Sequence, residues 1–317
     1  MTKPPTVSVV MITYNHENFI KEAIQGVLTQ VSDFTIELII ANDKSTDATH
    51  QVIDELLEKN IPEHIHIRYY NHKGNKGMMS NFIWALQQAK GKYIALCEGD
   101  DYWTDPLKLQ KQADFLEENK GFVLCCHNAF FLNSVSSKTQ ERVIPKLRQD
   151  KEYTELELNK GAWILTPTLF FRNLNDIHDI LNKVESKILN SDMLLFSILG
   201  KFGKGKYIES IEPVMYRVHE GGVWSSKKHD KIFVWWNRYQ LEKVLSHLHR
   251  ENDEVSVFFK KRLTDLNRKL HRNLYRLNRE QVKELNMDYF KWNKFEPYRI
   301  KGFIKHNFTY LRLKFGL

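Results

Sequence analysis

The sequence has few cysteines and no long hydrophobic run. Only three cysteines occur among 317 residues, and two of them, Cys125 and Cys126, are neighbours inside an apolar stretch. This pattern excludes a disulfide-rich secreted scaffold and is typical of buried thiols in a reducing compartment. The longest apolar stretch, residues 122–132, is well short of the ~20 residues that cross a bilayer. Residues 1–5 show no signal-peptide pattern, so we expect a cytoplasmic protein.

Two common nucleotide-binding motifs are also missing. No G-x-G-x-x-G follows a predicted strand, which argues against a dinucleotide-binding fold. The run GKFGKGK at 200–206 resembles a P-loop, but Tyr207 stands where a Ser or Thr would bind Mg²⁺. It also follows a predicted helix and precedes a predicted strand, which is the reverse of a phosphate-binding loop.

Positive charge is scarce in the first two thirds of the chain and concentrated in the last third. Residues 225–317 hold 22 Lys and Arg against 10 Asp and Glu, whereas residues 1–224 hold 25 against 29. Helical spacing of apolar residues dominates from Lys231 onward. We therefore predict a boundary between a first domain over 1–225 and a basic helical C-terminal extension over 226–317.

Short apolar runs alternate with helical spacing over the first hundred residues. The runs predict strands at 8–15, 36–41, 65–70 and 93–97, with helices at 17–30, 48–59 and 78–89 between them. This alternation predicts an α/β fold with a mainly parallel sheet flanked by helices. Ligands bind beyond the carboxyl ends of such strands. The polar residues expected to meet in that crevice are Thr13, Tyr14, Asn15, Asn42, Asp43, Glu98, Asp100 and Asp101.

The pattern is looser after residue 120. Strands are predicted at 122–132, 163–172, 207–211 and 213–219, a helix at 192–202, and an irregular excursion at 134–157.

The tetrapeptide at 98–101 places three carboxylates directly after a buried strand. Glu98, Asp100 and Asp101 repel one another unless a cation compensates them. Oxygen ligands suit Mg²⁺ or Mn²⁺, which commonly couple a carboxylate to substrate phosphates. The alternative is a turn that caps the next helix, but Asp105 already meets that need.

Four single residues allow a structural as well as a functional reading. Asp43 could accept hydrogen bonds from a nucleoside or cap a turn, and Tyr14 could stack on a base or simply pack. Asp192 precedes an apolar helix, where an N-cap is the structural alternative. His219 could bind a metal or a phosphate, although a lone histidine is more often structural.

Six separated segments together resemble family-2 glycosyltransferases with the GT-A fold. They are VSVVMITYN at 7–15, IIANDKSTDAT at 39–49, GNKGMMSNF at 74–82, KGKYIALCEGDDYW at 90–103, NSDMLLF at 190–196 and YRVHEGGVWS at 216–225. The resemblance covers residues 5–225 in order and spacing. It departs from the family at Asn42, Lys44 and Glu98, where Asp, Gly and Asp are commoner.

The resemblance implies an inverting, metal-dependent transfer of a sugar from a nucleotide-sugar donor, with UDP as the expected nucleotide, to a glycan or a lipid-linked acceptor in surface-polysaccharide synthesis. Asp192 matches the catalytic base, and Asp100, Asp101 and His219 match the Mg²⁺ or Mn²⁺ site. The donor site is implied to comprise Thr13, Tyr14, Asn15, Asp43, Asn81, Glu98 and Asp100. We expect the acceptor side at Trp103, residues 163–168 and the excursion at 134–157.

The basic extension leaves two interpretations open: attachment to an anionic membrane surface at the inner face of the plasma membrane, or a solvated bundle packed on the catalytic domain. Two other functions remain as alternatives, a non-catalytic binding protein on a degenerate transferase fold and a nucleotidyltransferase. No recognition motif supports nucleic-acid binding.

Overall fold

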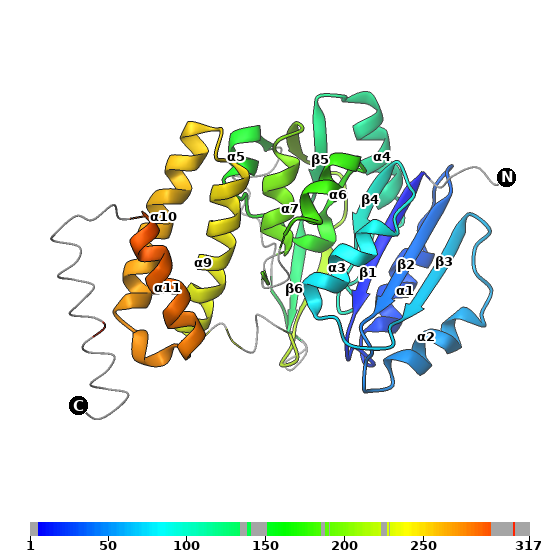
Figure 1. Ribbon diagram of the computed structural model, residues 1–317. Helices are drawn as coiled ribbons and strands as arrows, with labels where there is room; N and C mark the ends of the chain where they lie inside the picture. The colour runs from blue at the N-terminus through cyan, green and yellow to red at the C-terminus, as the bar shows by residue number, and fades with distance from the viewer. Residues whose placement is uncertain are drawn as a thin grey trace. The chain divides into compact units, whose positions relative to one another are not determined.

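The computed structural model describes residues 6–133, 138–140, 151–184, 188–189, 191–222, 227, 229–292 and 307 (Figure 1). The chain forms two compact units, Met1–Ser225 and Ser226–Leu317.

An eight-stranded sheet is the centre of the first unit. Its order is β3-β2-β1-β4-β9-β5-β10-β8. The strands are β1 (Val7–Thr13), β2 (Ile36–Asn42), β3 (Ile65–Asn71), β4 (Tyr93–Leu96), β5 (Phe122–Cys126), β8 (Glu152–Tyr153), β9 (Phe170–Arg172) and β10 (Lys204–Tyr207). Strands β1 to β4 are mutually parallel, and β1 pairs with β2 from Val7↔Ile36 to Thr13↔Asn42. The predicted mainly parallel sheet is confirmed, with β9 and β8 as its antiparallel members.

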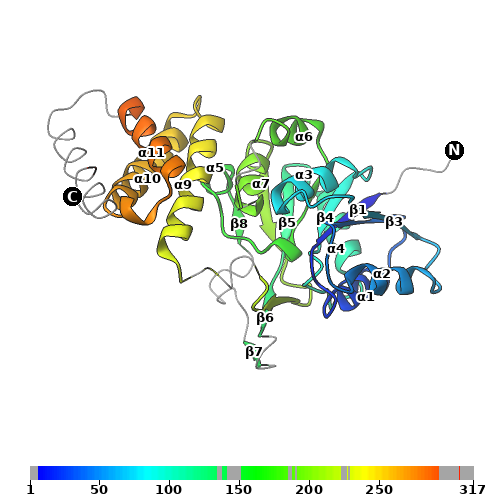
Figure 2. The ribbon, with the colours of Figure 1, turned by 60° about the horizontal axis from the view of Figure 1, so that its bottom comes forward.

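Helices cover both faces of this sheet. They are α1 (Ile20–Leu28), α2 (Thr49–Leu57), α3 (Met78–Gln87), α4 (Lys108–Glu118), α5 (Glu155–Asn159), α6 (Asn175–Leu181) and α7 (Ser191–Leu199). Figure 2 shows α3, α6 and α7 on one side and α1, α2 and α4 on the other. Every residue of β1 and β2 is buried, as expected for central parallel strands covered on both faces.

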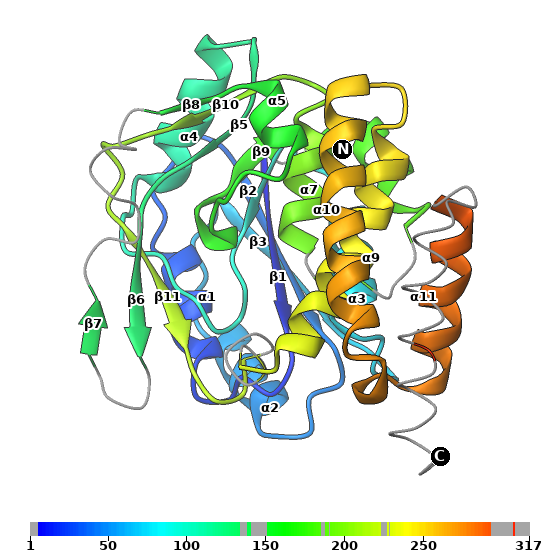
Figure 3. The ribbon, with the colours of Figure 1, turned by 90° about the vertical axis from the view of Figure 1, so that its left-hand side faces the viewer.

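The predicted strand at 122–132 is wrong in one respect, because it is two strands in two sheets. After β5 the chain leaves the large sheet, and β6 (Ala129–Asn133) joins β11 (Val214–Val218) and β7 (Lys138–Gln140) in a three-stranded sheet (Figure 3). The exchange of partners occurs at the break: the Cys126 carbonyl accepts from Ile208 N, and the Asn128 carbonyl accepts from Val214 N. Continuous hydrophobicity could not show this break, because both strands are largely apolar in sequence.

Two other predicted strands are displaced. Residues 163–172 are a 3₁₀ turn at Thr166–Thr168 followed by the short β9, since Pro167 has no N–H to give to a sheet. The strand predicted at 207–211 lies at 204–207, where Gly205 lets the backbone pack against Leu124. Most of the excursion predicted at 134–157 lies outside the described residues.

The second unit is helical, as its apolar spacing predicts. It contains α9 (Lys231–Leu248), α10 (Asp253–His271), a 3₁₀ turn at Leu274–Arg276 and α11 (Arg279–Trp292). Side chains of Asp230 and Asn252 cap the first two helices. A cluster including Tyr239, Leu263 and Leu270 forms its core. Among the helices that the structure describes, none combines the length and apolar character of a membrane span.

Candidate active site at the carboxyl edge of the sheet

A cavity of about 410 Å³ lies in the first unit, where β1, β2 and β4 end. Seven of the residues predicted from the sequence line it: Thr13, Tyr14, Asp43, Asn81, Glu98, Asp100 and Asp192. Asn15, Asp101 and His219 do not belong to the lining. The cavity also contains side chains from distant segments, among them Met78, Thr166, Tyr216 and Arg217. The expected convergence of strand ends on one crevice is therefore what the structure shows.

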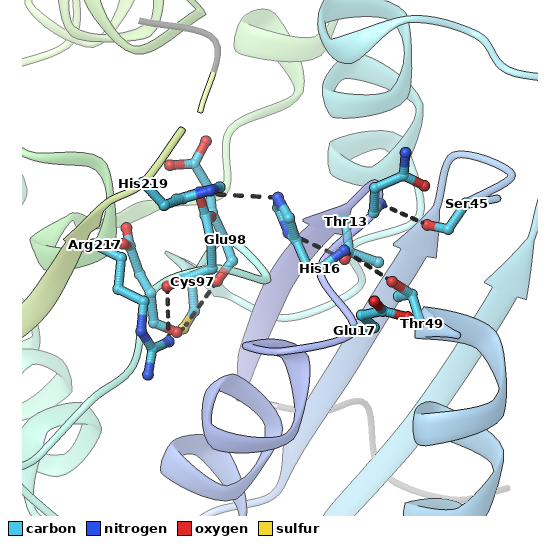
Figure 4. Close-up of polar contacts among 12 residues, drawn as sticks. Thr13, His16, Glu17, Ser45, Thr49, Cys97, Glu98, Arg217 and His219 are labelled. Atoms are coloured by element: carbon cyan, nitrogen blue, oxygen red, sulfur yellow. Dashed lines mark hydrogen bonds and ion pairs between the residues drawn. The ribbon is translucent and has the colours of Figure 1, made fainter. Parts of the chain in front are cut away.

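The loop after β1 is tied to the loop after β2. Asn15 adopts a left-handed conformation (φ 56°), its N–H donates to Ser45 Oγ, and its Oδ1 accepts from Thr46 N. The N–H of His16 donates to Thr49 Oγ1 at 2.8 Å (Figure 4). Asn15 thus holds the two loops together, and the next residue, His16, lines the cavity.

Asp43 positions the loop that precedes α3. Its two carboxylate oxygens accept from Lys76 N at 2.6 Å and Gly77 N at 2.9 Å, and its carbonyl accepts from Asn75 Nδ2. Lys44, which stands where the resembling family commonly has Gly, has φ 58°. A lysine in this left-handed conformation carries a steric cost that glycine avoids.

Asn81 of α3 is also held by the protein. Its Nδ2 donates to the Ala41 carbonyl, and its Oδ1 lies 2.9 Å from His72 Nε2. These bonds place α3 against the end of β2 and define one wall of the cavity.

Gly99 allows the loop after β4 to approach the end of β1. A Cβ at this position would lie 2.6 Å from Thr13 Oγ1 and 3.0 Å from His16 Nδ1. Such distances are well below van der Waals contact. A glycine between Glu98 and Asp100 is therefore what lets the acidic loop and the β1–α1 loop share one site.

Asp100 lies between two imidazoles. His219 Nε2 is 3.0 Å from Asp100 Oδ2, and His16 Nε2 is 3.9 Å from the same oxygen. The rings of His16 and His219 lie edge to face with their centroids 5.9 Å apart (Figure 4). Burial opposes ionisation of Asp100, but the two histidines hold its pKa below its ordinary value. Burial is also the main cause of the lowered pKa of His16.

Asp101 is separate from this cluster, in contrast to the predicted metal set. It is 1% exposed, and its Oδ1 accepts from Arg217 N at 2.9 Å. Its Oδ2 is buried without a hydrogen-bond partner among the described residues. Burial, with Asp100 and Glu98 nearby, raises its pKa well above the ordinary value. The structure therefore places His16, and not Asp101, beside Asp100 and His219.

Glu98 adds a further carboxyl group to the cavity. Its burial, together with the charges of Asp100 and Asp192, raises its pKa to about 8. Arg217 partly compensates: its Nη1 donates to the Asp100 carbonyl at 2.9 Å and its Nη2 pairs with Glu22. The Arg217 guanidinium also lies over the Tyr102 ring, 4.7 Å from the centroid.

Several cavity residues were not predicted from the sequence, among them His16, Tyr216 and Arg217. These three lie in or directly after segments that carried the family resemblance, beside residues that were chosen. A signal was present for His16, because the predicted β1–α1 loop belongs to the same crevice. Trp103, expected at the acceptor side, is buried and donates Nε1–H to the Pro167 carbonyl, so it supports the turn that carries Thr166.

Comparison with known proteins shows the family of the chain. The family model described as glycosyl transferase family 2 matches residues 8–181. An uncharacterized protein of Mycobacterium tuberculosis is 33% identical over 258 residues, which cover 78% of this chain and 71% of that protein. An Escherichia coli UDP-Glc:alpha-D-GlcNAc-diphosphoundecaprenol beta-1,3-glucosyltransferase is 35% identical over 116 residues, 37% of this chain and 43% of that enzyme.

Among solved structures, Staphylococcus aureus TarS 1–349 in complex with UDP superposes with a TM-score of 0.61 at 18% identity, over 94% of this chain and 83% of that one. The fold is that of the GT-A glycosyltransferases. The chain belongs to glycosyl transferase family 2, and its class of activity is glycosyl transfer.

Proposed function

We propose that this protein transfers a sugar from a UDP-sugar to a hydroxyl group of a glycan or lipid-linked acceptor, with inversion, in the synthesis of a cell-surface polysaccharide. The main observation is that one cavity is lined by Asp192, Asp100 and His16, and that His219 lies 3.0 Å from Asp100. A base for the acceptor and a group of ligands for a diphosphate-bound cation are the two components that such a transfer needs.

The walls of the cavity support a nucleotide donor. Tyr14 is 44% exposed at the mouth, which leaves its ring available for stacking on a base. Thr13 and Asp43 lie at the ends of adjacent strands, where nucleosides bind in open α/β sheets. The UDP named in the TarS complex and the UDP-Glc named for the Escherichia coli enzyme also support UDP.

Asp100 and His219 fit a divalent cation. Their ligand atoms are 3.0 Å apart, and a second carboxylate, Glu98, lies in the same cavity. When bound, Mg²⁺ or Mn²⁺ would neutralise charge on the diphosphate of the donor. The raised pKa of Glu98 shows how strongly this part of the cavity disfavours a further uncompensated negative charge.

Asp192 is the proposed general base. It removes the proton of the acceptor hydroxyl while that oxygen bonds to the anomeric carbon and the bond from this carbon to the diphosphate oxygen breaks. The nucleoside diphosphate leaves with the electron pair, and Arg217 at the cavity wall supplies positive charge. A single displacement of this kind inverts the anomeric configuration.

The test combines ligand binding with product analysis. A nucleotide sugar that binds the native state raises its thermal stability, so a screen with and without Mn²⁺ should identify a UDP-sugar. Asp192→Asn should then bind that donor as wild type does and lose transfer, while Asp179→Asn on the exposed side of α6 serves as the matched control. Equal donor binding with turnover within about threefold of wild type would remove Asp192 as the base. Release of diphosphate in place of UDP would indicate nucleotidyl transfer.

The basic second unit suggests where the acceptor is met. Each Lys or Arg close to an anionic surface contributes about 1 kcal/mol of attraction. With 22 Lys and Arg against 10 acidic residues in 225–317, peripheral attachment to the inner face of the plasma membrane is part of the proposal. Full-length protein should sediment with anionic vesicles at low salt and remain in solution with neutral vesicles. Failure to sediment with anionic vesicles would contradict attachment without touching the transferase proposal.

A further inference from the structure

The loop after β1 adds a second imidazole to the proposed cation site. One potential ligand atom from each of His16, Asp100 and His219 lies within 4.8 Å of the others. We propose that His16 is a protein ligand of the cation, so that two imidazoles and one carboxylate hold it and select Mn²⁺ or a softer transition metal over Mg²⁺. This inference rests on the proposed function, because it concerns the cation that contacts the donor diphosphate.

The separations suit one ion. Ligands about 2.1 Å from an octahedral ion are roughly 3.0 Å apart when adjacent and about 4.2 Å apart when opposite. His219 Nε2 and Asp100 Oδ2 are 3.0 Å apart, and His16 Nε2 and Asp100 Oδ2 are 3.9 Å apart. The first value is that of adjacent ligands, and the second lies between the adjacent and the opposite value, so a shift of the His16 ring toward Asp100 and His219 is needed for the three groups to share an ion.

The other nitrogen of His16 has the kind of partner that metal-binding histidines have. His16 Nδ1 lies 3.2 Å from Thr13 Oγ1. The tautomer that donates Nδ1–H to this hydroxyl leaves a lone pair on Nε2, directed toward Asp100 and His219. Hydrogen bonds of this type orient the ring and increase its basicity as a ligand.

The surroundings hold the His16 ring in this position. Its backbone N–H donates to Thr49 Oγ1, and the centroid of the Phe19 ring lies 6.3 Å from that of His16 and 4.7 Å from that of His219. The side chains of His16 and His219 are 15% and 9% exposed. Rigid, largely buried ligands of this kind are a pre-organised site rather than a chance meeting of surface groups.

The ligand types determine which ion is preferred. Mg²⁺ binds oxygen and retains several waters, whereas imidazole nitrogen suits transition metals. A site of two carboxylates, as Asp100 with Asp101 would have been, accepts Mg²⁺ well. Replacing one carboxylate by His16 shifts the preference toward Mn²⁺ and metals to its right in the first-row series.

Electron spin-echo spectroscopy of Mn²⁺ bound to the full-length protein, with UDP present, tests the proposal directly. Wild type should show ¹⁴N couplings from two imidazoles, and His16→Ala from one. By titration, His16→Ala should lower Mn²⁺ affinity at least tenfold and Mg²⁺ affinity less than threefold. His247→Ala, on the exposed side of α9, is the matched control and should match wild type. If His16→Ala does not fold, the wild-type spectrum alone decides.

The results separate this inference from the proposed function. One ¹⁴N coupling in wild type, or Mn²⁺ affinity unchanged in His16→Ala, would overturn the role of His16 and leave a cation on Asp100 and His219. Absence of any Mn²⁺ binding with UDP would overturn the metal requirement and this inference together. His16→Asp gives a second check, since a carboxylate there should move the preference toward Mg²⁺ by at least tenfold.

Discussion

Replacing Gly99 by alanine should damage the site through a single added methyl group. The new Cβ would lie 2.6 Å from Thr13 Oγ1, 2.8 Å from Thr13 Cβ and 3.0 Å from His16 Nδ1. Carbon atoms in contact are normally about 3.5–4.0 Å apart. Rotating the Thr13 side chain relieves the contact with Oγ1 but not that with Cβ, because Cβ is fixed to the backbone. The loop after β4 must therefore move away from β1.

The expected loss of stability is that of an overpacked core, about 2 kcal/mol, which corresponds to a fall in Tm of roughly 4–8 °C for a unit of this size. Because the same movement separates Asp100 from His16, Mn²⁺ affinity in the presence of UDP should also fall at least tenfold. Calorimetric unfolding and Mn²⁺ titration measure both effects.

Gly121→Ala is the matched control, because a Cβ at this exposed turn would meet no atom within 4 Å. It should keep the wild-type Tm and Mn²⁺ affinity. If Gly99→Ala behaved like this control, the close approach of the two loops would not be the reason for a glycine at position 99.

Three further variants test other parts of the structure. Asp101 accepts a hydrogen bond from the Arg217 backbone and lies outside the His16, Asp100 and His219 cluster, so Asp101→Asn should keep Mn²⁺ affinity within about threefold of wild type, whereas Asp100→Asn should lower it at least tenfold. The opposite order in a titration would place the ion at Asp101. Burial lowers the pKa of Lys108 to about 7, so between pH 7 and 10.5 the unfolded chain binds more protons than the folded protein. The free energy of unfolding therefore rises with pH in this range, and Lys108→Met should remove about 2 kcal/mol of that rise between pH 7.5 and 9. If the free energy of unfolding, measured by urea titration, rose equally with pH in wild type and Lys108→Met, the prediction would be contradicted. Glu242→Gln leaves two arginines of the second unit without their buried partner and should lower that unit's stability by about 2 kcal/mol, measured by thermal unfolding, and an unchanged Tm would show that this ion pair contributes little.

The parallel half of the fold could be predicted because its signals are local. Each of the first four strands is a short apolar run, each helix between them has apolar residues at helical spacing, and the connections are short. The later strands could not be predicted equally well. β5 and β6 read as one apolar run, and only their hydrogen-bond partners in two different sheets separate them. The strand predicted at 163–172 was too long, because Pro167 lies in a 3₁₀ turn before the short β9.

The sequence predicted which residues line the cavity better than it predicted how their side chains are arranged. Parallel strand ends necessarily meet at one edge, and that rule placed Asp43, Glu98 and Asp100 together from the sequence. The direction in which neighbouring carboxylates point is different, because it depends on contacts that cross the chain. Asp101 faces the backbone of Arg217, 116 residues away, while Asp100 faces His219.

The amino-acid sequence by itself determined the family, the parallel sheet, the helical second unit and the edge at which the cavity forms, because periodicity and strand-end chemistry are properties of neighbouring residues. Only the tertiary structure decided that His16 joins Asp100 and His219 while Asp101 turns inward. That choice depends on the close packing of Gly99 against Thr13, a contact between two loops more than 80 residues apart that no local pattern encodes.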